Sequence, residues 1–267
     1  WPTFRAAEGA LRRSRLQEAL GDPGCADGAL DLAKRAPIRQ PQDELLARAA
    51  RCLGASDPTR AAQLWRRLLR EHPESDLWGE GLAALGGNGG FVETVTQQQK
   101  RTRTLFERRA YERCRVSAEE LWKKSKDRSL REELAYFLGK IGSERLRDDY
   151  PAAERYLRIA SRSGAADAER ALSSWGIVLG KLGRSEEAVA AFDEWLRRYA
   201  RRAPRARVVE AQYDRGVALH RAGRSREAAA SMRRYLERHR GGFDWVKYWW
   251  FVGWWSLAAG DTAAAIE

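Results

Sequence analysis

Apolar residues recur along most of the chain at the three- and four-residue spacing of a helix with one buried face. Ala61, Leu64, Trp65, Leu68 and Leu69 form one such set, and residues at this spacing lie on the same side of a helix. No segment shows the strand-like alternation of apolar and polar residues. The pattern predicts an all-α fold, with helices at Thr3–Leu20, Ala26–Ala36, Gln42–Leu53, Thr59–Glu71, Ser75–Leu85, Tyr111–Lys126 (led into by Leu105–Ala110), Arg131–Ile141, Pro151–Ser161, Ala166–Leu182, Ser185–Tyr199, Arg205–Ala222, Arg226–His239 and Phe243–Ala259.

The C-terminal third repeats itself. The run Leu179–Ala188 recurs as Leu219–Ala228, and a third copy begins at Leu257. The turns would be closed by glycines spaced 41, 40 and 37 residues apart, which are Gly142, Gly183, Gly223 and Gly260. Helix on both sides of a glycine at such a period is typical of stacked helical hairpins. We therefore expect an α-solenoid of about seven hairpins, a fold that usually offers a curved binding surface instead of a catalytic pocket.

Three regions are predicted along the chain. Residues 1–85 form N-terminal helical hairpins, 86–103 a glycine-rich and polar junction, and 104–267 a tetratricopeptide-like superhelix. Gly86–Gly90 holds four glycines in five residues, which favours a loop or hinge. The polar stretch Thr94–Arg103 is either a mobile connector or the start of a polar helix. Glu267 falls inside the expected second helix of the last hairpin, so we expect the superhelix to be truncated at its C-terminus and the sequence to be a piece of a longer protein.

The chain is basic, with 49 Lys and Arg against 37 Asp and Glu and a net charge of +12. The excess is mostly arginine, and alanine is abundant, so codon bias of a GC-rich genome is one explanation. A surface that attracts a polyanion is the other. The basic residues are spread over every helix and form no dense block, which disfavours nucleic acid. No stretch of eighteen apolar residues occurs, so we expect no transmembrane segment.

The chain offers no convincing catalytic, cofactor or metal site. The three cysteines lack metal-ligand spacing, and the three histidines are far apart. Adjacent carboxylates such as Glu186 and Glu187 point about 100° apart on a helix and do not converge on one bond. The hairpin over residues 26–53 would bring Cys25 beside Cys52. The sequence leaves open whether they form a disulfide, as in an oxidising compartment, or remain two buried thiols.

Several residues resemble known families. The small-x-x-x-aromatic pattern at Ala61 and Trp65, and at Ala188 and Phe192, resembles tetratricopeptide-type repeats, although the period here exceeds their roughly 34 residues. The runs Tyr213–Gly223 and Tyr248–Gly260 are similar to the superhelical region of bacterial soluble lytic transglycosylases. This resemblance covers roughly Leu45 to Glu267. It implies a periplasmic or cell-envelope protein in which a helical superhelix lies beside a C-terminal, lysozyme-like domain that cleaves peptidoglycan.

The catalytic residues of that family are not found in this chain. The family uses a glutamate in a Glu-Ser motif that is followed by a Gly-Leu-Met-Gln-like run. Glu74-Ser75 is followed by Asp76-Leu77-Trp78-Gly79 instead, so we interpret Glu74 as a residue at a helix start. No catalytic position is carried over, and the sequence leaves open whether the parent protein is an enzyme.

An aromatic cluster is the strongest candidate for contact with a ligand. Seven rings between Trp245 and Trp255 surround one predicted helix on all sides, and such a helix is usually buried on all sides. The alternative is that some rings line the concave face and stack on sugar rings, with nearby arginines pairing with carboxylates of the glycan strand. The candidate contact residues for a glycan or a partner are Trp249, Trp250, Trp254, Arg215 and Arg221.

Two functions follow from these observations. The first is the non-catalytic superhelical domain of an envelope lytic transglycosylase, with peptidoglycan glycan strands and the protein's own missing C-terminal domain as partners. The alternative is a tetratricopeptide-type scaffold that binds a protein or peptide in its groove. A basic nucleic-acid binder is a third and weaker interpretation. None of these functions calls for a cofactor.

Overall fold

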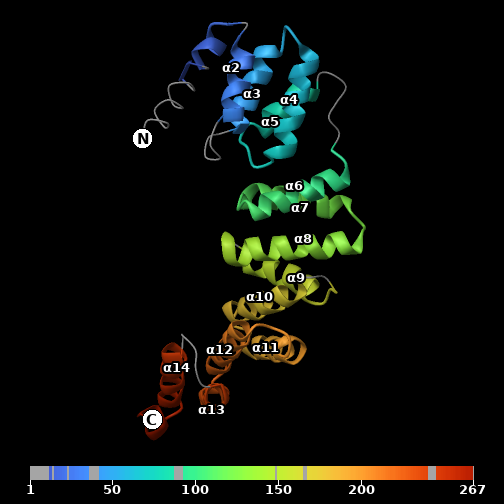
Figure 1. Cartoon of the computed structure of the whole chain (residues 1–267). Coiled ribbons are helices and arrows are strands. Elements are labelled where there is room, and N and C mark those ends of the chain that lie inside the picture. Colours follow the sequence, from blue (N-terminus) through green and yellow to red (C-terminus); the bar gives the residue numbers. More distant parts are fainter. Residues whose placement is uncertain are drawn as a thin grey trace. The chain divides into compact units, whose positions relative to one another are not determined.

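The computed structural model describes residues 12–13, 15–22, 24–35, 42–86, 93–147, 149–164, 167–239 and 245–266. The chain divides into two compact units, Trp1–Cys114 and Arg115–Glu267, and the division falls within helix α7 (Tyr111–Lys124). Throughout the described ranges the regular elements are helices (Figure 1), which confirms the predicted all-α class. The region boundaries predicted at 85/86 and 103/104 lie at the ends of the glycine-rich and polar segment, whereas the two units are defined by their compactness. The predicted boundaries therefore stay a prediction.

The first unit stacks helices in the order of the chain. It contains α2 (Cys25–Arg35), α3 (Gln42–Leu53), α4 (Pro58–Glu71), α5 (Trp78–Gly86) and α6 (Val95–Glu107). From α2 to α5 each helix packs on the next, and the buried residues are mostly alanine and leucine, which allow close approach. Asp57 caps α4 by accepting from the Arg60 N–H at 2.9 Å, and Pro58 follows it, as the sequence predicts. Most of the predicted helix Thr3–Leu20 lies outside the described residues.

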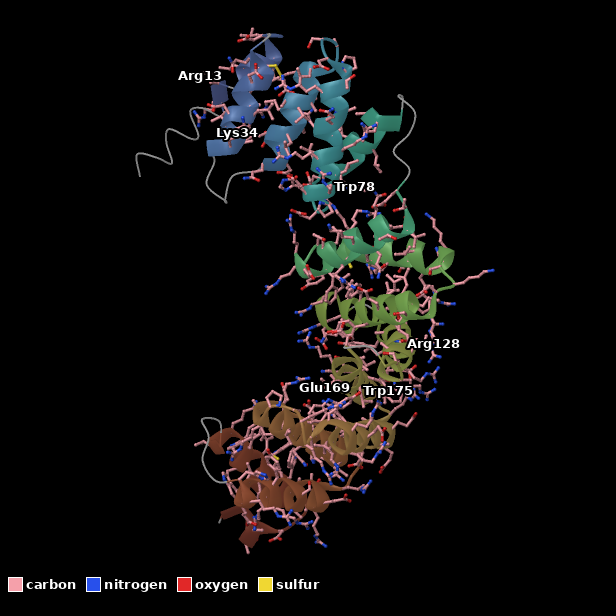
Figure 2. All side chains as sticks on the ribbon, turned by 45° about the vertical axis from the view of Figure 1, so that its right-hand side comes forward. Arg13, Lys34, Trp78, Arg128, Glu169 and Trp175 are labelled. Atoms are coloured by element: carbon pink, nitrogen blue, oxygen red, sulfur yellow. A yellow bond between two sulfur atoms is a disulfide. The ribbon has the colours of Figure 1, made fainter. Side chains whose placement is uncertain are left out.

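Around the junction the structure corrects one prediction and decides between two alternatives that the sequence leaves open. The helix predicted from Ser75 begins at Trp78, because the chain first turns through Ser75, whose Oγ accepts from the Leu77 N–H at 3.2 Å. The polar stretch after the glycines is a helix and not a connector: Thr94 and Gln97 form a capping box that starts α6. Arg101 of α6 lies over the ring of Trp78, the residue labelled in Figure 2, with its guanidinium carbon 4.3 Å from the ring centroid. Gly87–Gly90 lie outside the described residues.

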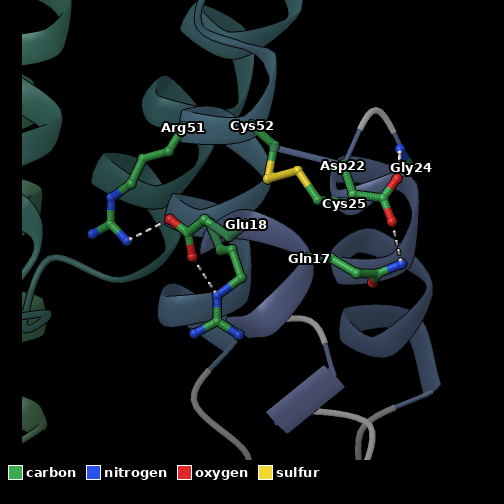
Figure 3. Close-up of a disulfide and its surroundings, with 8 residues drawn as sticks. Gln17, Glu18, Asp22, Gly24, Cys25, Arg51 and Cys52 are labelled. Carbon is green, nitrogen blue, oxygen red and sulfur yellow. Dashed lines mark hydrogen bonds and ion pairs between the residues drawn. A yellow bond between two sulfur atoms is a disulfide. The ribbon is translucent and has the colours of Figure 1, made fainter. Parts of the chain in front are cut away.

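Cys25 and Cys52 form a disulfide between the start of α2 and the end of α3, with their Cα atoms 6.1 Å apart (Figure 3). The sequence predicted that they are neighbours, and the structure selects the disulfide over two free thiols. Beside it, Glu18 accepts from Arg48 at 2.8 Å and from Arg51 at 3.3 Å. The buried Arg48 also pairs with Glu44 at 2.7 Å, so two carboxylates stabilise this guanidinium away from water.

The second unit continues the helical stack. It contains α8 (Arg128–Lys140), the π-helix η1 (Ile141–Arg145), α9 (Tyr150–Ser161), α10 (Ala168–Lys181), α11 (Ser185–Tyr199), α12 (Arg205–Arg221), α13 (Ser225–Arg238), α14 (Trp245–Ala258) and α15 (Thr262–Ile266). From α8 to α15 each α-helix packs on the next one in sequence. The first helices of successive hairpins, α8, α10 and α12, also pack on one another. These neighbour contacts are those of a solenoid.

The repeated turns are closed by glycines in the left-handed region. Gly183, Gly223 and Gly260 have φ of 76°, 80° and 77°, a conformation that costs little only for glycine. Gly142, predicted as the fourth turn glycine, belongs instead to η1, which occupies part of the predicted insert Gly142–Tyr150. Some of the extra residues there are taken up by π-helical winding, and Arg147, which follows η1, has a φ of 60° in the left-handed region.

Small residues in the first helices make room for large side chains of neighbouring helices. A Cβ on Gly176 would come 2.8 Å from the ring of Phe192 in α11, and a Cβ on Gly216 would come 2.3 Å from the ring of Trp255 in α14. Phe192 and Trp255 are among the largest fully buried side chains of the described residues. The repeats are therefore held in register by a ring of one helix seated on a glycine of another.

Candidate functional site

The three turn glycines give α10, α12 and α14 a common register. The residues six positions before Gly183, Gly223 and Gly260 are Ile177, Val217 and Trp254. Those ten positions before are Ser173, Tyr213 and Trp250, and those two positions before are Lys181, Arg221 and Ala258. Equal distances from equivalent turns place these residues on equivalent sides of the three helices. We name the following set the first-helix face: Ile177, Lys181, Tyr213, Val217, Arg221, Trp250 and Trp254.

Direct contacts join the three helices along this face. Arg221 of α12 donates to the backbone carbonyl of Gly180 in α10 at 3.4 Å. Between α12 and α14, the rings of Tyr213 and Phe251 are 4.7 Å apart, and those of His220 and Trp254 are 4.5 Å apart. The first-helix face is therefore one connected surface within the second unit.

Three apolar side chains of the first-helix face are exposed to solvent. Ile177 is 39% exposed, Trp254 42% and Trp250 62%. The rings of Trp250 and Trp254 lie nearly parallel, with centroids 6.3 Å apart and 9° between their planes. Tyr248, Val252 and Trp255 form the buried side of α14, and burial of the helix on all sides stays a prediction. The side chain of Trp245 lies outside the described residues.

The structure separates the predicted contact residues into two groups. Trp250, Trp254 and Arg221 belong to the first-helix face. Trp249 is 38% exposed, but it stands eleven residues before its turn glycine, about 100° around the helix from Trp250, so it lies off the face. Arg215 pairs with Asp193 at 2.5 Å and with Glu227 at 3.4 Å. Its side chain is 15% exposed, and its charge is neutralised by these carboxylates of α11 and α13.

A carboxyl group that the sequence analysis did not single out lies beside the face. The pKa of Asp214 is raised to about 7, chiefly by burial and then by the nearby charge of Glu210, against the opposite effect of Lys247 and Arg207. The Lys247 ammonium lies 5.2 Å from the ring centroid of Tyr213 and 5.3 Å from that of Tyr248. No sequence signal marks Asp214, because its environment comes from two helices that are more than twenty residues apart.

The described ranges offer no candidate metal centre. They hold no group of three or more His, Cys, Asp or Glu side chains that could bind a metal ion. Glu74 pairs with Arg108 and precedes α5 by several residues, so it is part of an ion pair and not at a helix start as predicted. Of the helices that the structure describes, none is both long and apolar enough to span a bilayer.

Comparisons with known proteins agree with this architecture. Residues 45–75 match the family model of the tetratricopeptide repeat, and no curated protein matches the chain. Among solved structures, YrrB, titled a TPR protein with an unusual peptide-binding site, is similar with a TM-score of 0.52 at 15% identity, over 77% of this chain and 88% of its own. The MamA RS-1 ArsTM double mutant has a TM-score of 0.51 at 15% identity, over 64% of this chain and 88% of its own.

At such low identity these likenesses concern the fold alone. They confirm the predicted α-solenoid of tetratricopeptide-like hairpins. Nothing in these comparisons links the chain to lytic transglycosylases, so that more specific resemblance stays a prediction.

Proposed function

We propose that this chain is a helical-repeat scaffold that binds an extended segment of a partner protein on its first-helix face. The observation that carries the proposal is the run of apolar side chains on the first-helix face. It is exposed at Ile177 of α10 and at Trp250 and Trp254 of α14, and partly buried at Tyr213 and Val217 of α12. Exposed apolar surface that is continuous across several elements marks an interaction site more often than scattered single residues do. YrrB, which has the same fold, is titled as having a peptide-binding site, and this supports a peptide as the type of ligand.

The chemistry of the face defines the partner segment. Tryptophan side chains offer large, rigid contact area and dominate many interfaces. Lys181 and Arg221 stand at one edge of the apolar row. The best ligand is therefore an extended segment with apolar side chains for Ile177 and the two tryptophans, and with an acidic residue near the Lys181–Arg221 edge.

A peptide display experiment tests this function. Peptides of random sequence are selected on the immobilised chain, and the affinity of the enriched peptides is then measured by fluorescence anisotropy. Trp254→Ala should weaken binding about thirtyfold or more, since a hot-spot residue contributes about 2 kcal/mol or more. Trp249→Ala, which removes a tryptophan of the same helix that lies off the face, is the matched control and should change affinity little. Equal losses in both variants, or no enriched peptide, would refute the proposal.

A specific observation also favours the second candidate, the superhelical part of an envelope lytic transglycosylase. The nearly parallel rings of Trp250 and Trp254 present flat apolar faces of the kind that sugar rings stack on. The disulfide between Cys25 and Cys52 supports a location in an oxidising compartment such as the periplasm. In this proposal the glycan strand replaces the peptide, and a catalytic domain outside these residues is a further partner.

Binding to purified peptidoglycan sacculi separates the two candidates. If glycan strands are the ligand, the parent chain sediments with sacculi and Trp250→Ala reduces the bound fraction, whereas Trp249→Ala does not. If the chain stays in the supernatant while selected peptides bind, the glycan candidate fails and the peptide candidate stands.

A further inference from the structure

The second unit holds a cleft that belongs to neither the first-helix face nor any predicted site. It has a volume of about 400 Å³ and lies where the end of α7, the start of α8 and the end of α9 meet. Its lining consists of Trp122, Lys126, Arg128, Arg131, Glu132, Ile159 and Arg162. We name it the basic cleft. The volume is within the range of pockets that hold a small ligand or a few side chains of a peptide.

The charge of the basic cleft is strongly unbalanced. Four cationic side chains face one carboxylate. Arg128, labelled in Figure 2, is exposed and pairs with that carboxylate, Glu132, at 2.9 Å. The positive charges of Lys126, Arg131 and Arg162 are then in excess, and three cations gathered around one hollow attract an anionic ligand.

Arg131 is held ready for such a ligand. Its guanidinium carbon lies 4.3 Å from the ring centroid of Trp122, and Trp122 in turn meets Tyr156 edge to face at 5.3 Å. A guanidinium that stacks on a ring keeps its N–H donors at the edge of its plane, where they can bind a carboxylate with two parallel hydrogen bonds. The aromatic pair therefore fixes the orientation of Arg131 before a ligand arrives.

The remaining lining selects a peptide over a nucleic acid. Ile159 is 42% exposed in the cleft and offers an apolar contact. Non-specific binders of single strands usually stack bases on free aromatic rings, but Trp122 is already engaged by Arg131 and Tyr156. We propose that the basic cleft binds an acidic peptide segment of a protein partner, with carboxylates on Arg131, Lys126 and Arg162 and an apolar side chain on Ile159.

This inference shares with the proposed function only the premise that the partner is a protein. The test uses the full chain and a fluorescein-labelled synthetic peptide, Glu-Glu-Leu-Glu-Glu, in anisotropy titrations at low ionic strength. Lys126→Gln combined with Arg162→Gln, and separately Arg131→Gln, should each weaken binding about tenfold or more, since hydrogen bonds to charged groups are worth about 1.5–3 kcal/mol. Far-UV circular dichroism should stay unchanged, because Lys126, Arg131 and Arg162 are exposed.

The matched control removes the same charge elsewhere. Arg201→Gln combined with Arg226→Gln changes two exposed arginines of the same unit and should leave peptide affinity within about twofold. Trp254→Ala, on the first-helix face, should also leave it unchanged, so failure of the proposed function and failure of the cleft are distinguishable. The inference is overturned if the parent chain does not bind the peptide, or if control and cleft variants lose affinity equally. It is also overturned if a labelled thymidine oligonucleotide binds through the cleft while the peptide does not.

Discussion

Replacement of Gly216 by alanine tests the packing that aligns the last repeats. The added methyl carbon would lie 2.3 Å from Cη2 and 2.6 Å from Cζ3 of Trp255, whereas carbon atoms in contact prefer about 3.5–4.0 Å. The indole of Trp255 is fully buried and has the rings of Tyr213 and Phe251 beside it at 6.2 Å and 5.8 Å. It therefore has no free space to move into, and α12 and α14 must separate.

Two opposing effects set the magnitude. Alanine is favoured over glycine inside a helix by about 1 kcal/mol, and overpacking a core costs about 1–3 kcal/mol or more. Because a rigid buried ring has to move by more than an ångström, we expect the cost at its upper end and a net loss of about 2 kcal/mol. Gly79→Ala is the control: Gly79 lies in α5 with no atom near a new Cβ, so this change should stabilise by about 0.5–1 kcal/mol.

Hydrogen–deuterium exchange along a urea series measures the loss in peptides from α12 and α14, because it reports the opening of this region by itself. A second variant, Trp255→Leu, removes the ring. In that background Gly216→Ala should cost much less than in the parent chain, and a double-mutant cycle gives the coupling. The reasoning fails if Gly216→Ala is as stable as the parent chain, or if its cost is the same with and without the indole.

Four further outcomes are expected. Under non-reducing denaturation a thiol reagent should find one thiol per chain, that of Cys114, and three after reduction; in the native chain Cys114 should not react at pH 8, because burial raises the pKa of its thiol to about 12. Reducing the Cys25–Cys52 disulfide should lower the stability of the first unit by about 3–4 kcal/mol, given a loop of 27 residues, seen as a lower urea midpoint. Arg48→Ala should cost about 1.5–3 kcal/mol in the same unit, since it removes the hydrogen bonds of a buried guanidinium to Glu18 and Glu44, which keep Arg51 and Arg15 as partners. The pKa of Asp214 is higher in the folded state, so its contribution to stability is complete below about pH 4 and is lost as the pH rises through about 7. Asp214→Asn should therefore raise the urea midpoint of α12 peptides at pH 8 but not at pH 4. An equal change at both pH values would contradict this.

Most helices could be predicted from the sequence because their buried faces recur at helical spacing and their ends carry local signals. The bounds Gln42–Leu53 and Ser185–Tyr199 agree with the structure at both ends. Where a local signal was read without its neighbours, the prediction failed. Ser75 looked like a helix start, but its side chain stabilises a turn instead. Gly142 looked like a turn glycine, but the helix continues through it as a π-helix.

The sites were less predictable than the fold, because they depend on contacts between helices. The sequence marked Trp250, Trp254 and Arg221, but it also marked Arg215, whose acidic partners Asp193 and Glu227 lie 22 and 12 residues away. The basic cleft draws on three helices, and its residues show no motif in the sequence. Only the packing of α7, α8 and α9 brings them together.

The bond between Cys25 and Cys52 has a mechanical consequence. If the folded chain were stretched from its two ends, the 27-residue interval between these cysteines could not extend, because the sulfur bridge carries the load in its place. Full extension of the oxidised chain would therefore be shorter than that of the reduced chain by roughly 90 Å. The force-bearing path through the first unit would bypass most of α2 and α3, which could lose their helical winding only after the rest of the unit had opened.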